Sequence, residues 1–176
     1  MKAKKSRSGH IVPFTLCLLL ATSLLTAASA HSSSMKFWNW DWNDFGKQVA
    51  GTYYIQEGNG AISLWTFSSN GTMTGASSAQ AALDFGPQHG TWKRTGPRQI
   101  AVVLLDFSYG KNGSLKNVAR VDSTVRFNRN FSRIEGELTV RFFDPETEDP
   151  LNLSTYTGPG PETDTLSGER LTVSGD

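Results

Sequence analysis

Residues 89–106 read HGTWKRTGPRQIAVVLLD and combine two extended segments with a tight turn. Gly96 and Pro97 interrupt the chain between residues 90–95 and a segment rich in Val, Leu and Ile. That second segment is too short and too β-branched for a helix, so the stretch predicts a β-hairpin. The arm 99–109 is apolar on both faces. We therefore expect a loop, the N-terminal segment or a partner subunit to cover its outer side.

The same pattern of short strands and turn signals continues in both directions from this hairpin. Asn-Gly pairs at 70–71 and 112–113 favour two-residue type I′ turns, because both residue types tolerate positive φ. No long helical pattern intervenes in the sequence, which is typical of an all-β sandwich or barrel. We expect eight strands, at residues 49–56, 61–68, 72–78, 90–95, 99–109, 115–128, 131–144 and within 163–173.

The expected strands at 115–128 and 131–144 alternate apolar and polar residues, and the charges on their polar faces distinguish two registers. A two-residue turn would set Arg126 against Arg133, whereas a longer turn places Arg126 beside Glu135. Like charges directly opposite one another are unfavourable. The sequence therefore predicts the longer turn, around residues 129–130.

The first thirty residues have the three parts of an export signal: a basic start, an apolar core over residues 14–25, and Ala28-Ser29-Ala30. The alternative is an uncleaved anchor, but the apolar core is shorter than the ~20 residues that span a bilayer. Cleavage would leave 146 of the 176 residues, starting at His31, with no stable membrane anchor. We expect a Trp-rich segment at 31–46 and one β-barrel domain at 47–176.

Cys17, the only cysteine, lies inside this leader, so the mature chain would contain no disulfide. An exported domain of this size without disulfides favours a bacterial periplasmic or extracellular location. Three of the five Trp residues (Trp38, Trp40 and Trp42) alternate with Asn and Asp at the start of the mature chain. We expect them to cap an open end of the barrel; the alternative is a surface that stacks sugars or binds a partner.

Charge and composition argue against several classes of function. Four of the 17 basic residues and none of the 16 acidic ones lie in the leader, so the mature chain has a net charge of −3 and no bulk attraction to nucleic acid. Its two histidines, His31 and His89, are far apart and no thiolate accompanies them, so we expect no transition-metal site and no cofactor. The acidic stretch 144–149 lacks the spacing of an EF-hand and is better interpreted as a solvated hairpin.

Catalytic signatures are weak. His89 with Asp84 or Asp106 would need a serine partner, and no Gly-x-Ser-x-Gly motif is present. A strand-end role for His89 is the simpler interpretation. The sequence leaves enzymatic activity uncertain, and a barrel enzyme of the isomerase or cyclase type is the least favoured alternative.

Several motifs resemble those of known β-barrel proteins. Residues 45–54, FGKQVAGTYY, are similar to the first-strand motif of lipocalins, with Tyr53 in place of a Trp. The runs at 67–72, 90–98 and 142–145 resemble small exported bacterial proteins with lipocalin-like, or calycin, barrels. The resemblance covers residues 45–173. It implies an antiparallel up-and-down barrel of eight strands, which is either filled by side chains or holds one small ligand.

Two functions follow from such a barrel. The first is non-catalytic binding of a small apolar or amphipathic ligand, lined by Tyr53, Trp65, Phe67 and Trp92. Arg94, Arg98 and Asp106 form a polar set that either anchors an anionic head group or closes a barrel end through a guanidinium packed over an indole. The second is an interaction module with a filled barrel that binds an envelope protein or another copy of itself. The volume of the cavity distinguishes the two.

Overall fold

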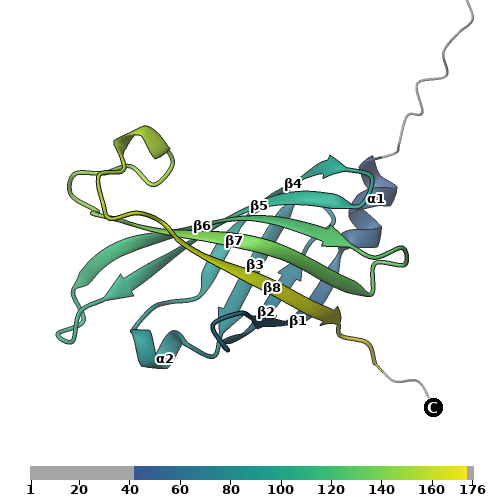
Figure 1. The fold of residues 1–176 in the computed structure, drawn as a ribbon, viewed down its shortest axis with the longest axis horizontal. Helices are drawn as coiled ribbons and strands as arrows, with labels where there is room; N and C mark the ends of the chain where they lie inside the picture. Colours follow the sequence, from purple (N-terminus) through teal and green to yellow (C-terminus); the bar gives the residue numbers. More distant parts are fainter. Residues whose placement is uncertain (1–41, 174–176) are drawn as a thin grey trace, which may run out of the picture. The chain divides into compact units, whose positions relative to one another are not determined.

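The computed structural model describes residues 42–173, and within them the chain forms a closed antiparallel barrel (Figure 1). Each strand pairs with the next along the chain, and β8 pairs with β1 to close the barrel. The elements are α1 (Trp42–Val49), β1 (Gly51–Glu57), β2 (Ile62–Phe67), β3 (Thr72–Ser77), α2 (Gln80–Leu83), β4 (Gln88–Gly96), β5 (Gln99–Tyr109), β6 (Leu115–Phe127), β7 (Arg133–Phe143), the 3₁₀ turn η1 (Leu153–Thr155) and β8 (Glu162–Arg170). The predicted all-β, eight-stranded up-and-down barrel is confirmed.

The register between β6 and β7 confirms the longer turn. Arg126 lies opposite Glu135, and Asp122 lies opposite Thr139. The turn is held by the side chain of Asn128, whose Oδ1 accepts hydrogen bonds from the backbone N–H groups of Ser132 (2.9 Å) and Arg133 (3.1 Å). Charge pairing on the outer face was therefore sufficient to predict this register.

One end of the barrel interior, next to α1, is filled by aromatic rings. Neighbouring ring centroids in this aromatic cluster are 5.2 to 6.3 Å apart, mostly in tilted or edge-to-face arrangements. Helix α1 covers this end with Phe45 and Val49, which are both buried. The aromatic cluster consists of Phe45, Tyr53, Phe67, Trp92, Phe127 and Phe131.

A cap is thus present at this end as α1, which covers it with Phe45 and Val49. The part that the Trp42 side chain takes in this cap lies outside the described residues. The leader with its cleavage site, and Trp38 and Trp40, lie outside the described residues. Their predicted roles stay predictions.

The outer face of β5 is only partly covered by residues 42–173. Ala101, Val103 and Leu105 are half-buried, and Phe107 is 52% exposed. Three of these four side chains lie beside polar residues of β6 (Thr124, Asp122 and Arg120). The long stem of Arg120 shields part of this apolar surface from water. Cover by the N-terminal segment or by a partner subunit stays a prediction.

Candidate functional site

The end of the barrel opposite α1 is open at its mouth and contains a cavity of about 460 Å³. Helix α2 lies beside this mouth, at the far end of the barrel from α1 (Figure 1). Small inward-facing residues on two strands leave the space: Gly75 and Ser77 on β3, and Ala119 on β6. A Cβ at Gly75 would lie 2.6 Å from Oε1 of Gln88, so a larger residue there would shift the end of the Gln88 side chain.

One wall of the cavity is apolar. Val121, Leu138, Val140 and Phe142 project inward from β6 and β7 at alternate positions along each strand. The segment around α2 adds apolar side chains at the rim, among them Leu83. This wall suits the hydrocarbon part of a ligand.

The floor of the cavity is polar and incompletely hydrogen-bonded. Nε2 of Gln88 donates to Oδ2 of Asp106 at 3.3 Å. Four other buried atoms have no hydrogen-bond partner among residues 42–173: Nε1 of Trp65, Oε1 of Gln88, Oδ1 of Asp106 and Oδ1 of Asn117. Trp65, Gln88 and Asp106 are only 2%, 8% and 5% exposed. A buried polar atom without a partner costs about 1–3 kcal/mol, so these four atoms make the cavity a candidate binding surface.

Burial also changes the acidity of the floor. It raises the pKa of Asp106 to about 6, and the hydrogen bond from Gln88 opposes that rise. At neutral pH this carboxyl is mainly ionised, although it faces a cavity with few donors. Such a perturbed group in a concave site is a functional candidate on physical grounds.

Further charges lie at the mouth. Glu57 is half-buried and accepts a hydrogen bond from the hydroxyl of Ser63 at 2.6 Å. Glu162 and Lys116 are exposed on the rim. Of the described residues that line the cavity, three carry carboxyl groups and one is basic, so the cavity is acidic.

The structure separates the residues that the sequence singled out into three places. Trp65 and Asp106 line the cavity. Tyr53, Phe67 and Trp92 lie in the aromatic cluster at the α1 end. The hydroxyl of Tyr53 donates to the carbonyl oxygen of Phe131 at 2.9 Å, and burial raises its pKa to about 12.

Arg94 and Arg98 do not meet Asp106. The guanidinium of Arg94 lies 4.3 Å from the ring centre of Phe45, and its Nε donates to the carbonyl oxygen of Gly96 at 2.9 Å. Arg94 pairs across the hairpin with Ile100, whereas Asp106 lies near the other end of the same long strand. The sequence expectation of a guanidinium closing one end agrees with the position of Arg94, with a phenyl ring beneath it.

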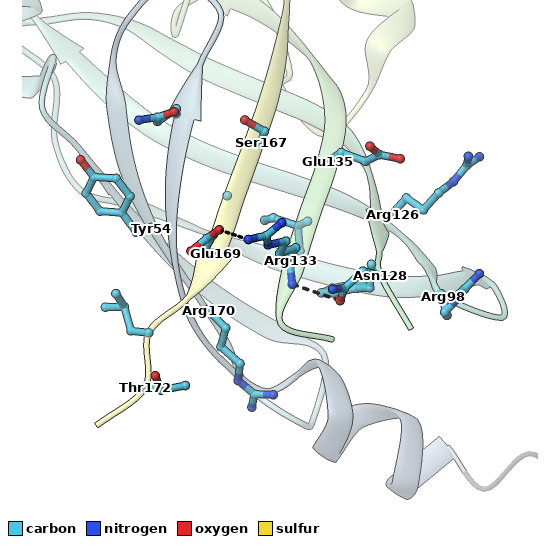
Figure 2. Close-up of a pocket in the computed structure, with 15 residues that line it drawn as sticks. Tyr54, Arg98, Arg126, Asn128, Arg133, Glu135, Ser167, Glu169, Arg170 and Thr172 are labelled. Carbon is cyan, nitrogen blue, oxygen red and sulfur yellow. Dashed lines mark hydrogen bonds and ion pairs between the residues drawn. The ribbon is translucent and has the colours of Figure 1, made fainter. Parts of the chain in front are cut away.

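Arg98 lies instead in a groove on the outside of the barrel, shown in Figure 2, with a volume of about 1020 Å³. Arg126 and Arg133 line the same groove, and Nη2 of Arg133 forms an ion pair with Oε1 of Glu169 at 2.9 Å. These two paired side chains are 70% and 68% exposed, so water and salt weaken their attraction. We therefore take the mouth cavity, with its buried unpaired groups, as the candidate site.

Sequence analysis missed most of the cavity lining, notably Gln88, Asn117 and Leu138. Strand periodicity does assign these residues to inward faces. Their position along the barrel axis depends on the stagger between strands, which no local pattern reports.

Comparison with known proteins adds no relative. No protein-family model, curated protein or solved structure matches this chain. The barrel topology is compatible with a lipocalin-like fold. Among the described residues, no helix is long and apolar enough to cross a membrane, and no three His, Cys, Asp or Glu side chains are grouped to hold a metal ion.

Proposed function

We propose that this protein is an exported binding protein that takes one small amphipathic molecule into the mouth cavity without chemical change. The observation that carries this proposal is a cavity with an apolar wall and a floor of buried polar atoms that lack partners. Its volume of about 460 Å³ falls in the range of small-molecule sites.

The filled-barrel alternative is less favoured because side chains fill only the α1 end. The aromatic cluster occupies that end, whereas the walls at the mouth enclose open space. A protein that acted only through its outer surface would gain stability from filling this space as well.

A substitution that fills the cavity tests the proposal. Val121→Trp adds an indole to the inward face of β6, while Thr124→Trp adds the same group to the exposed outer face of that strand. We expect the first variant to lose binding of N-phenyl-1-naphthylamine, a neutral apolar fluorescent probe, and the second to bind it as the parent does. Circular dichroism checks that both variants are folded.

Ala119→Leu serves as a milder filling variant if the Val121 variant does not fold, since Ala119 also lines the cavity. Native mass spectrometry of protein purified from its own host should in addition show a bound mass. Unchanged probe binding in a folded filled variant would refute the proposal, because it would place the probe outside the barrel.

A further inference from the structure

We infer that the ligand of the mouth cavity carries a protonated amine, which binds at the floor to Asp106. This inference rests on the proposed function and adds the chemical class of the ligand. Two observations support it: most of the unpaired polar atoms are hydrogen-bond acceptors, and the lining of the cavity is acidic.

The unpaired atoms of the floor are mainly acceptors. Gln88 directs its Nε2 to Asp106, which leaves Oε1 of Gln88 and Oδ1 of Asp106 as unsatisfied oxygens. Oδ1 of Asn117, nearer the mouth on β6, is a third unsatisfied oxygen of the lining. The orientation of Gln88 follows from its neighbour, because an ionised carboxylate only accepts hydrogen bonds. Trp65 supplies the one unpaired donor among the buried side chains that line the described cavity. An ammonium group has three donors and no acceptor, so it complements this floor.

A carboxylate or phosphate head group would not complement it. Such a group brings only further acceptors and a negative charge to a buried carboxylate that has a single side-chain donor beside it. Two negative charges repel each other strongly in a site that is shielded from water. A hydroxyl group would satisfy part of the floor but would leave the charge of Asp106 without a counterion.

The other charged residues of the lining also favour a positively charged ligand. Glu57 from β1 and Glu162 from β8 add carboxyl groups, and Lys116 from β6 opposes them from the exposed rim. Tyr109 from β5 is the other titratable lining residue. A charge-assisted hydrogen bond in a site shielded from water is stronger than a neutral one, so the amine gains affinity at the floor and the hydrocarbon part gains it along the apolar wall.

Three probes with one hydrocarbon chain separate the head groups. Octylamine, 1-octanol and octanoate compete with N-phenyl-1-naphthylamine for the protein at pH 7.5. We expect octylamine to bind at least about tenfold more tightly than 1-octanol, as for a hydrogen bond to a charged group, and octanoate to bind most weakly.

Two variants with the same change of charge locate the effect. Asp106→Asn should remove the advantage of octylamine over 1-octanol, measured as the ratio of the two affinities in the same variant. Glu137→Gln changes a carboxyl on the exposed outer face of β7 and should preserve the advantage.

A change of pH gives an independent readout. Octylamine stays protonated between pH 7.5 and 5, whereas Asp106 becomes neutral over that range, so the advantage should shrink toward pH 5. An advantage that survives at pH 5 or in Asp106→Asn would overturn the role of Asp106. Equal binding of octylamine and 1-octanol would overturn the inference while the proposed function stands. Failure of every probe to bind would instead refute the proposed function.

Discussion

Asp106 ends the apolar run of β5 and is the residue on which the chemistry of the cavity depends. Its carboxyl is buried, with Gln88 as the hydrogen-bond partner of one oxygen. A buried carboxylate with so few donors destabilises the folded state when it is ionised. The protein therefore retains a group that costs stability at the floor of its cavity, as is common where binding rather than packing decides the residue.

We predict that Asp106→Asn stabilises the protein at neutral pH. The pKa of Asp106 is raised from 3.8 to about 6 on folding, so its ionisation penalises the folded state, slightly near pH 4 and fully above pH 6. The free energy of unfolding of the variant should exceed that of the parent by on the order of 2–3 kcal/mol at pH 7.5. The difference should become small near pH 4 and vanish below the unfolded-state pKa of 3.8.

Urea denaturation at intervals from pH 4 to 7.5 measures this difference. Glu137→Gln controls for the loss of one negative charge at an exposed site. A difference that does not vary with pH would contradict the raised pKa, and a less stable Asp106→Asn at pH 7.5 would mean that the carboxylate has donors we have not identified.

At the scale of single elements, the strand pair β6 and β7 shows how charge selects register. Arg126 and Glu135 are direct neighbours on an outer face that is exposed to water. Exposed pairs of this kind contribute little to stability. Their effect is to disfavour the register in which Arg126 would meet Arg133.

We predict that Glu135→Lys lowers the free energy of unfolding by only a few tenths of a kcal/mol. The change places two cations opposite each other where water screens them. Glu137→Lys is the matched control, because Glu137 lies between Thr124 and Thr165 with no cation opposite. Denaturation in urea measures both variants. A loss several times larger in Glu135→Lys would show that a partner or another segment covers this face.

The strands were predictable because their signals are local. Alternation of apolar residues and the Asn-Gly pairs located the eight strands, with shifts of a few residues at their ends. The turn type was wrong: positive φ occurs at Gly71 and Gly113 but not at Asn70 or Asn112, so the loops have three residues and are not the predicted two-residue type I′ turns. The short helix α2 has too few residues to show a helical period. The site was less predictable: Trp65 and Asp106 line the cavity, while Arg94 lies with the aromatic cluster, because the barrel's stagger and not the hairpin alone sets which residues share one end.

At the scale of the whole molecule, the interior of the barrel has two different ends. The end next to α1 is closed by packed rings, and the hydroxyl of Tyr53 ties β1 to the turn at Phe131. Phe131 itself has φ of 57°, an uncommon conformation for an aromatic residue, and its ring is buried against Phe127 and Phe45. The packing of the ring offsets the cost of that backbone conformation.

We predict that the protein isolated from the medium or periplasm of its host starts at His31. The basic, apolar and small-residue parts of residues 1–30 form the pattern that a signal peptidase cleaves. Edman sequencing or mass spectrometry of the N-terminus measures this. A chain that retains Met1 would contradict export with cleavage.

The unequal filling of the barrel has a consequence for how its binding preference can change. The rings next to α1 supply much of the buried apolar area, whereas Ala119, Val140 and Phe142 at the mouth contribute less to the core. Substitutions among the mouth residues therefore alter the shape and charge offered to a ligand at a modest cost in stability. On the proposed function, the residues that stabilise the fold are separate from those that contact the ligand, so a few substitutions at the mouth would change the specificity.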